Sequence, residues 1–252
     1  MTATHDDLVR SQFGATANAY VASAVHASGA DLDTIAARAA SVAPARALDL
    51  GAGGGHVAYA IAPHAGAVVA CDLSADMLGA VAAEAARRDI GNIATQAAAA
   101  EALPFPAGHF DFLACRFSTH HWRDAEAGLR EARRALSPGA PAIFVDIVAP
   151  PAPALDTHLQ TVELLRDGSH VRDYRVDEWS AMLTRAGFDL RAIARGRLRM
   201  DFADWTQRMR TPPAHVAAIR ALQQQASEDV ARHFAIEPDG SFTIDMALFE
   251  VG

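Results

Sequence analysis

A glycine-rich segment that follows a short apolar run constrains the fold of this chain more than any other stretch. Residues 47–58 read ALDLGAGGGHVA, with glycines at Gly51, Gly53, Gly54 and Gly55. This order predicts a buried strand, a tight turn and the start of a helix. Glycine permits positive φ and lets a ligand approach the backbone, and the first N–H groups of the helix then face that ligand. The segment predicts a nucleotide-type cofactor site at the carboxyl end of a first strand.

The spacing of the glycines distinguishes two classes of cofactor. The dinucleotide pattern G-x-G-x-x-G, counted from Gly51, needs a third glycine where the chain has His56. Counted from Gly53, it needs a glycine where the chain has Ala58. The spacing therefore disfavours a nicotinamide dinucleotide. An acid, Asp49, lies at the strand end just before the turn.

A second aspartate has the position of a ribose ligand. The run AVVAC at residues 67–71 predicts the next strand, which ends at Asp72. Asp72 follows the glycine turn by about 20 residues, where a carboxylate can accept hydrogen bonds from both ribose hydroxyls. Each feature alone is equally an ordinary glycine turn or strand-end aspartate. Their order and spacing together predict a bound adenosine cofactor.

Length and charge exclude several classes of protein. The 252 residues suffice for one large domain or two small ones. No apolar run reaches about 18 residues, and no basic segment followed by an apolar one marks a secretory signal. A net charge of −8 without a basic tail disfavours nucleic-acid binding. We expect a cytoplasmic protein with a small-molecule substrate and no nucleic-acid or membrane partner; the oligomeric state stays open, a homodimer included.

Cysteines and arginines have plain structural interpretations. Cys71 and Cys115 lie near strand ends, where buried free thiols are expected. Apart from the adjacent His120 and His121, no group of His and Cys residues has the spacing of metal ligands, so no metal site is expected. A solvated face of an outer strand is favoured over an anion site for four arginines at odd-numbered positions, Arg191, Arg195, Arg197 and Arg199.

Strands and helices alternate along the remainder of the chain. Strands are predicted at residues 45–50, 67–71, 92–97, 110–115, 142–148, 188–199 and 241–251. Helices are predicted in 5–40 (broken near Gly29, with Asp31 as an N-cap) and at 54–62, 74–88 (N-cap Ser74), 124–136, 156–166, 177–186, 201–210 and 214–234. This alternation implies βαβ units, and the predicted fold class is α/β with a doubly wound, mostly parallel sheet.

The predicted organisation has three regions. Residues 1–44 form an N-terminal helical cap, 45–150 a cofactor-binding α/β core, and 151–252 the rest of the sheet. Helical insertions at 150–176 and 201–238 flank the carboxyl edge of the sheet. Such insertions can close over a site and exclude water, or they can simply cover sheet edges.

Four ordered motifs resemble the type 11 branch of class I S-adenosylmethionine (SAM)-dependent methyltransferases, related to ubiquinone/menaquinone C-methyltransferases. They are ALDLGAGGGHVA, which contains D-x-G-x-G-x-G, then VVACDLSADML, AAAAEALPFPAGHFDFLACRFSTHHW and LREARRALSPGAPAIF. The later segments HVRDYRVDEW and DFADWTQRMRTP look like an uncharacterised bacterial subgroup of that branch. The resemblance implies a Rossmann-like fold, SAM as cofactor and S-adenosylhomocysteine as its product.

The same resemblance implies which residues hold the cofactor. Gly51 and Gly53 would face the methionine moiety and Asp72 the ribose, while Leu73 and Met77 would line the adenine pocket. The full implied set is Tyr20, Asp49, Gly51, Ala52, Gly53, Asp72, Leu73, Met77, Ala99, Ala100, Glu101, Arg116 and Phe117.

Three positions within that set qualify the assignment. Many relatives carry an aspartate at the position of Ala99, so a contact with the adenine amino group is missing here. Arg116 follows the fourth strand, where family members pack on the methionine end of the cofactor. Tyr20 matches an N-terminal aromatic residue that covers SAM in relatives, although a core position explains it equally well.

Two adjacent histidines are the candidates for acid–base chemistry. A sulfonium methyl is already activated, so its transfer needs alignment and dry surroundings more than an acid–base pair. If a base is used, histidine is the natural candidate, and His120 and His121 follow the fourth strand at the carboxyl edge. Neighbours on an extended segment point opposite ways, so at most one should face the site. A structural histidine bonded to backbone is the alternative.

Aromatic and charged residues in the insertions are candidates for binding the methyl acceptor. Guanidinium and aromatic groups would suit a planar or carboxylated small molecule. Packing of the insertions against the domain is the equal alternative. The candidates are His170, Arg172, Tyr174, Trp205 and Arg208.

The sequence thus predicts a SAM-dependent methyltransferase that transfers a methyl group to a small molecule by in-line displacement. An NAD(P)-dependent oxidoreductase and a SAM-binding protein without turnover remain as alternatives. The acceptor and the methylated atom are not encoded in any recognisable motif.

Overall fold

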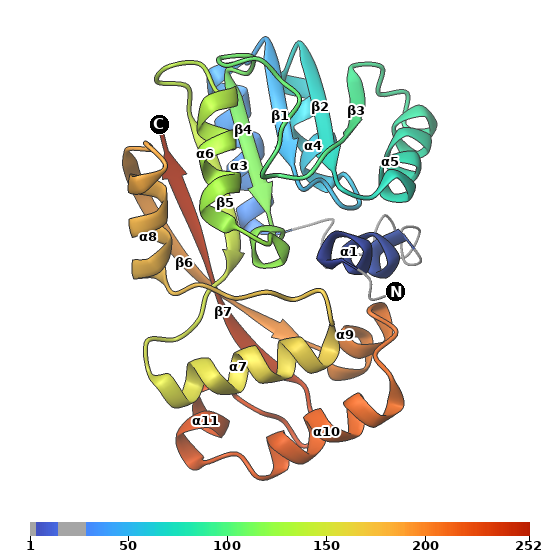
Figure 1. Ribbon diagram of the computed structural model, residues 1–252, viewed down its shortest axis with the longest axis vertical. Coiled ribbons are helices and arrows are strands. Elements are labelled where there is room, and N and C mark those ends of the chain that lie inside the picture. Colours follow the sequence, from blue (N-terminus) through green and yellow to red (C-terminus); the bar gives the residue numbers. More distant parts are fainter. Residues whose placement is uncertain (1–3, 15–28) are drawn as a thin grey trace.

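A seven-stranded sheet forms the centre of the molecule in a computed structural model that describes residues 4–14 and 29–252 (Figure 1). The strands are β1 Arg46–Leu50, β2 Ala67–Asp72, β3 Ile93–Ala97, β4 Phe112–Arg116, β5 Ala142–Ile147, β6 Leu190–Met200 and β7 Phe242–Val251. The helices are α1 His5–Gly14, α3 Ala30–Val42, α4 His56–Ile61, α5 Ala75–Arg87, α6 Ala125–Ala135, α7 Pro153–Arg166, α8 Val176–Arg185, α9 Phe202–Arg208, α10 Pro213–Gln224 and α11 Glu228–His233. Two short 3-10 turns are η1 Ala62–His64 and η2 Thr119–His121. Tyr20 lies outside the described residues.

The strand order β3-β2-β1-β4-β5-β7-β6 reverses direction between β1 and β4. Strands β1 to β5 pair in parallel, whereas β7 runs antiparallel to both β5 and β6. Helices connect the parallel strands across both faces of the sheet (Figure 1). The predicted doubly wound, mostly parallel α/β fold is confirmed. The topological switch point, where the strand order changes direction, lies between β1 and β4. Ligands bind at this point in open sheets of this kind.

Two apolar cores cover the two faces of the sheet, because the central strands are buried on both sides. One core packs α3, α4 and α5 on the sheet through side chains such as Ile35, Ile61 and Val81. The other packs α6 and α8 on the opposite face through Leu129 and Trp179. Helices on both faces leave the carboxyl edge of the sheet free for a site.

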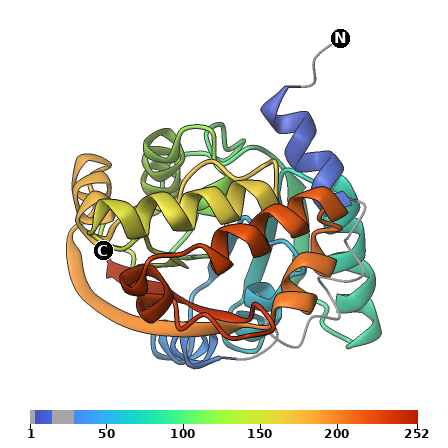
Figure 2. The same cartoon turned by 90° about the horizontal axis from the view of Figure 1, so that it is seen from below.

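A second layer lies beyond that carboxyl edge. Helices α7, α9, α10 and α11 gather there, and α7 and α10 run side by side (Figures 1 and 2). Strands β6 and β7 reach into this layer, because β6 pairs with β7 as far as Phe242 whereas β5 pairs only with residues 246–251. Within residues 4–14 and 29–252, no helix combines the length and apolar character needed to cross a membrane.

Helix caps explain several boundaries of the elements. The side chain of Ser74 accepts a hydrogen bond from Met77 N at 3.3 Å, which confirms Ser74 as the N-cap of α5. In the second layer, the prediction of a single helix over 214–234 is wrong, because two helices, α10 and α11, occupy this range. The range divides because Ser227 caps a new helix, α11, through its hydroxyl.

The prediction that Asp31 caps a helix is also wrong. The N-cap of α3 is Gly29, with φ 140°, and Asp31 lies one residue inside the helix. Its carboxylate instead forms an ion pair with Arg116 at the end of β4, and both side chains are more than nine-tenths buried. Asp31 thereby ties α3 to the strand end that borders the site.

Candidate active site

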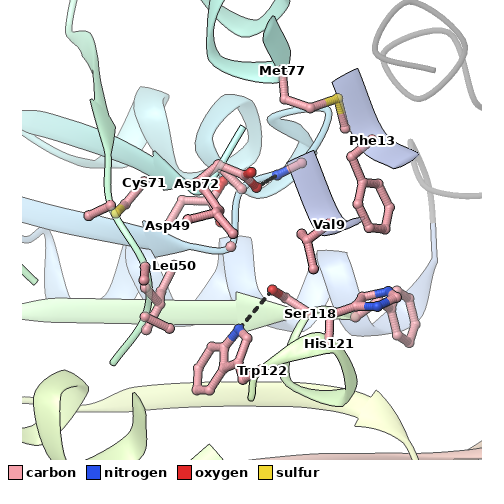
Figure 3. Close-up of a pocket in the computed structure, with 18 of the residues that line it drawn as sticks. Val9, Phe13, Asp49, Leu50, Cys71, Asp72, Met77, Ser118, His121 and Trp122 are labelled. Atoms are coloured by element: carbon pink, nitrogen blue, oxygen red, sulfur yellow. Dashed lines mark hydrogen bonds between the residues drawn. The ribbon is translucent and has the colours of Figure 1, made fainter. Parts of the chain in front are cut away.

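A pocket opens at the switch point, where the carboxyl ends of β1, β2 and β4 meet (Figure 3). It encloses about 1020 Å³, including the part open to solvent. One wall consists of the glycine turn after β1 and the ends of β2 and β3, and the other consists of α1 and the segment after β4. We call these the glycine wall and the helix wall.

The glycine turn presents backbone rather than side chains to the pocket. Gly51, Gly53 and Gly55 have φ of 73°, 48° and 79°, which L-residues rarely adopt. A Cβ on Gly51 would lie 2.0 Å from Ser118 Oγ, so only glycine fits between the two walls. A Cβ on Gly53 would find its nearest neighbour at 3.8 Å, which leaves this part of the backbone open to a ligand.

Asp72 ends β2 within the glycine wall, and its carboxylate is bound to backbone donors. Its Oδ2 accepts a hydrogen bond from Gly53 N at 2.8 Å, and its Oδ1 accepts one from Ser74 N at 2.9 Å. Burial raises the pKa of Asp72, and the backbone hydrogen bonds oppose that effect. A carboxylate oxygen has more than one lone pair, so each can accept a further hydrogen bond from a ligand.

Asp49 lies deeper in the glycine wall and is almost fully buried. Its Oδ2 accepts a hydrogen bond from Ala58 N at 2.9 Å, which ties the end of β1 to the start of α4. Burial raises the pKa of Asp49 to about 7; the hydrogen bond from Ala58 lowers it, and the nearby charge of Asp72 adds to the rise. Asp49 therefore titrates near neutral pH.

The remaining residues predicted to hold the cofactor also lie around the pocket. Met77, at the start of α5, is buried and reaches the space above Gly53. Glu101 accepts a hydrogen bond from Asp124 N at 3.1 Å, which fixes the segment after β3 against α6. All the predicted cofactor residues within the described ranges line the pocket: Asp49, Gly51, Ala52, Gly53, Asp72, Leu73, Met77, Ala99, Ala100, Glu101, Arg116 and Phe117. Their contacts with a cofactor stay a prediction.

The segment after β4 begins the helix wall with an unusual backbone. Phe117 has φ 53°, a strained value for a bulky residue that is often found at functional sites. The guanidinium of Arg116 lies over the Phe117 ring, 4.7 Å from its centroid. Ser118 Oγ accepts a hydrogen bond from Trp122 Nε1 at 3.1 Å, and both side chains face the pocket (Figure 3).

Helix α1 completes the helix wall. His5, Val9 and Phe13 are four residues apart, so they lie on one face of the helix, and all three line the pocket. His5 Nε2 lies 2.8 Å from the carbonyl oxygen of His121, and the rings of Phe13 and His121 meet edge to face with centroids 4.9 Å apart. The N-terminal helix thus faces the glycine wall across the pocket.

The two candidate histidines have different surroundings. They lie on the 3-10 turn η2 rather than on an extended segment, so the premise that they point opposite ways is wrong, and their ring centroids are only 4.2 Å apart. His121 lines the pocket. His120 lies behind it, with Nδ1 2.6 Å from Asp146 Oδ1 at the end of β5.

The residues predicted to bind the acceptor do not line this pocket. His170 is buried with Nε2 3.0 Å from Gln160 Oε1, and Arg172 pairs with Asp156 at 3.0 Å. Trp205 is buried in the second layer, where the Arg166 guanidinium lies 4.9 Å from its ring centroid. These contacts hold the insertions together, and a role of these residues in acceptor binding stays a prediction. The other two candidates, Tyr174 and Arg208, are half-buried outside the pocket lining.

Several pocket residues were not predicted from the sequence. The spacing of four between His5, Val9 and Phe13 indicates one helix face, but nothing in the sequence says what that face covers. Ser118 and Trp122 lie inside a quoted motif without an assigned role. Among the described residues, no three His, Cys, Asp or Glu side chains are placed to hold a metal ion. The unpredicted lining residues nearest the helix wall are His5, Asp6, Val9, Phe13, Ser118, Trp122 and Arg123.

Comparison with known proteins identifies relatives that match most of the chain. The family described as "Methyltransferase domain" matches residues 48–144. The chain is 44% identical to the uncharacterized protein YafE of Escherichia coli over 78% of this chain and 95% of YafE. It is 32% identical to the uncharacterized methyltransferase YcgJ of Bacillus subtilis, over 89% of this chain and 88% of YcgJ.

Solved structures agree with this match. The crystal structure of YcgJ superimposes with a TM-score of 0.84 and 30% identity, covering 88% of this chain and 97% of YcgJ. A putative methyltransferase from Bacillus halodurans superimposes equally well, with a TM-score of 0.84 and 30% identity over 88% of this chain and 98% of that one. The similarity includes the second layer as well as the sheet, because it covers most of both chains.

Proposed function

The chain belongs to the methyltransferase domain family, and from this premise we propose that it binds SAM in the pocket and transfers its methyl group to a small-molecule acceptor. The observation that carries the proposal is the glycine wall: an open stretch of backbone at Gly53 directly beside the half-buried carboxylate of Asp72. SAM offers a ribose diol, an adenine and a methionine, and these groups need a carboxylate, an apolar slot and backbone donors.

The residues of the glycine wall fit such a ligand. Gly51 and Gly53 both have positive φ, and the nearest atom to a Cβ on Gly53 would be Met77 Cε at 3.8 Å, which leaves room for a ligand at that point. Asp72 would accept the ribose hydroxyls with oxygens that already hold the turn in place. Leu73, Met77 and Ala100 would bound the adenine, since they line the pocket beyond Asp72.

SAM supplies a methyl group activated by its sulfonium, so the protein's contribution is alignment and the exclusion of water. The helix wall serves both needs. The apolar side chains of Val9, Phe13 and Trp122 exclude water from the side of the pocket opposite the glycines. His5, Ser118 and His121 add polar groups that can orient an acceptor, which we place between SAM and α1.

Calorimetry with SAM, S-adenosylhomocysteine and NADH tests the proposal. We expect the first two to bind and NADH to show no binding. Asp72→Ala should weaken SAM binding by about 1.5–3 kcal/mol, the range for lost hydrogen bonds to a charged group.

Asp76→Ala is the matched control, because Asp76 is an exposed aspartate in the first turn of α5, only four residues away. It should bind SAM like the wild type. If Asp72→Ala and Asp76→Ala bind SAM equally well, Asp72 does not hold the ribose. If the wild type binds neither sulfur compound, the proposed function is wrong.

A further inference from the structure

A group of buried ionisable side chains lies directly behind the helix wall. His120 and His121 come from η2, Asp146 from β5, and Glu163 from α7. The segment between α7 and α8 contributes Asp167, His170 and Asp173, all nine-tenths or more buried. Such a density of charge in an interior demands a defined protonation state for each group.

His120 is the charged histidine of this group. Both its backbone N–H, at 3.2 Å, and its Nδ1, at 2.6 Å, are bound by the carboxylate of Asp146. Burial alone would lower the pKa of His120, but attraction to Asp146 and the hydrogen bond with it raise the pKa to about 9. His120 and Asp146 therefore form a buried ion pair at neutral pH.

His121 has the opposite surroundings. Its Nδ1 lies 3.2 Å from the carbonyl oxygen of Ser169, which can only accept, so Nδ1 carries the proton and Nε2 has a free lone pair. Burial and the positive charge of His120 lower the pKa of His121 to about 3. His121, the member of the pair that lines the pocket, is therefore uncharged.

We propose that the His120–Asp146 ion pair keeps the adjacent imidazole of His121 neutral, so that His121 adds no positive charge to the pocket that receives a cationic methyl donor. His120 acts here as a positioning residue, because it affects the ligand through His121. The role toward the ligand rests on the proposed function, whereas the protonation states do not.

Charged groups on the neighbouring elements also affect the protonation of His120 and His121. On His121, the carboxylate of Asp167 favours the charged form, with Oδ2 3.9 Å from Nε2, while Arg166 at the end of α7 disfavours it. On His120, Asp173 and Glu163 add to the attraction of Asp146. His5 of α1 approaches this pair at the carbonyl oxygen of His121.

His170, also in this group, remains neutral. Its Nε2 donates to Gln160 Oε1, which also accepts from Asp173 N, and burial lowers the pKa of His170 to about 2. Of the three histidines in this group, His120 is therefore the charged one, and His121 and His170 are neutral.

Nuclear magnetic resonance of histidine-labelled protein tests the protonation states without any ligand. In the wild type, His121 should not titrate between about pH 5 and about pH 8, and His120 should remain an imidazolium across that range. In His120→Gln, the resonances of His121 should begin to titrate within it, because the repelling charge is gone. His64→Gln, at an exposed histidine in η1, is the matched control and should leave His121 unchanged.

Two results would overturn the proposal. Titration of wild-type His121 near its ordinary pKa would show that it is not held neutral. If His121 still does not titrate in His120→Gln, and circular dichroism shows that this variant keeps the wild-type fold, then burial alone keeps His121 neutral. Asp146→Asn provides a second variant with the same expected direction, since it removes the partner that keeps His120 charged.

Measurements of ligand affinity test whether the protonation state of His121 affects binding in the pocket. SAM carries the sulfonium charge and S-adenosylhomocysteine does not, so the ratio of their dissociation constants isolates its effect. The ratio should be constant with pH in the wild type, and in His120→Gln it should shift against SAM by roughly tenfold as the pH falls, the factor expected for two unit charges several ångströms apart. A ratio independent of pH in both proteins would overturn the ligand role, whereas no binding of either compound would contradict the proposed function and leave the protonation result intact.

Discussion

The glycine wall and the helix wall of the pocket are built in opposite ways. The glycine wall comes from segments that are close in sequence, and its contacts are short-range ones such as the hydrogen bond from Gly53 N to the carboxylate of Asp72, 19 residues apart. The helix wall combines α1 with the segment after β4, which includes η2, and the contact between His5 and His121 spans 116 residues. A cofactor shared by a family suits a wall encoded locally, whereas a wall assembled from distant segments can change its side chains without disturbing the cofactor.

The largest effect should follow a change in the glycine wall. Gly51→Ala places a methyl group 2.0 Å from Ser118 Oγ at a φ of 73°, so the turn must shift. We expect SAM affinity to fall by at least about 100-fold and the free energy of unfolding by about 2–3 kcal/mol. Calorimetry and urea denaturation measure the two quantities.

Gly79→Ala is the matched control for that substitution. Gly79 lies within α5, and no atom lies within 4 Å of the position of its Cβ. Alanine there should stabilise the helix by about 0.5–1 kcal/mol and leave SAM affinity unchanged. Equal SAM affinity of the Gly51→Ala and Gly79→Ala proteins would remove the distinction between the two walls.

The next effect concerns the support of the helix wall. Arg166, at the end of α7, donates from Nε to Trp205 O at 3.0 Å, stacks on the Trp205 ring and pairs with buried Glu163. Arg166→Met leaves Glu163 without its cation, and we expect a loss of about 2–3 kcal/mol of stability. SAM affinity should change by less than about threefold, because the glycine wall is built independently.

Arg232→Met is a suitable control for Arg166→Met, since Arg232 forms only exposed ion pairs on α11. Its free energy of unfolding should match that of the wild type. A large loss of SAM affinity in Arg166→Met, in protein that remains folded, would show that the two walls are coupled.

The smallest effect is a pH dependence of the free energy of unfolding, which we assign to Asp49 in the glycine wall. Because the pKa of Asp49 is raised to about 7, the folded state holds its proton more tightly than the unfolded chain. The contribution of Asp49 to stability is therefore fully present below the unfolded pKa of about 4 and is lost as pH rises through about 7. Asp49→Asn should flatten this dependence and raise stability near pH 8 by about 1–2 kcal/mol.

Thermal denaturation at about pH 5 and about pH 8 measures that effect. Asp189→Asn makes the same change of charge at an exposed site before β6 and should keep the wild-type dependence. If the wild type becomes more stable as the pH rises from about 5 to about 8, and Asp49→Asn removes that gain, the predicted direction of the pH dependence is wrong.

The fold and the glycine wall could be predicted because their signals are local. The glycines, Asp72 and the Ser74 cap lie within 24 residues of one another in the sequence, and each constrains its own backbone. The position of α1, the ion pair of Asp31 with Arg116 and the burial of Trp205 depend on distant contacts that no local pattern contains. Trp205 and Arg208 are three residues apart and so share one face of α9, but that spacing does not say what the face meets.

The place of β7 in the sheet has a consequence for how the molecule assembles. This strand separates β5 from β6 and pairs with both, although both precede it in the chain. During synthesis, β1 to β5 can form their parallel pairs, but the strand that pairs with β6 in the described part of the chain, β7, leaves the ribosome last of all the strands. The same strand carries Phe242 into the second layer, so the sheet edge and that layer should close in one late cooperative step.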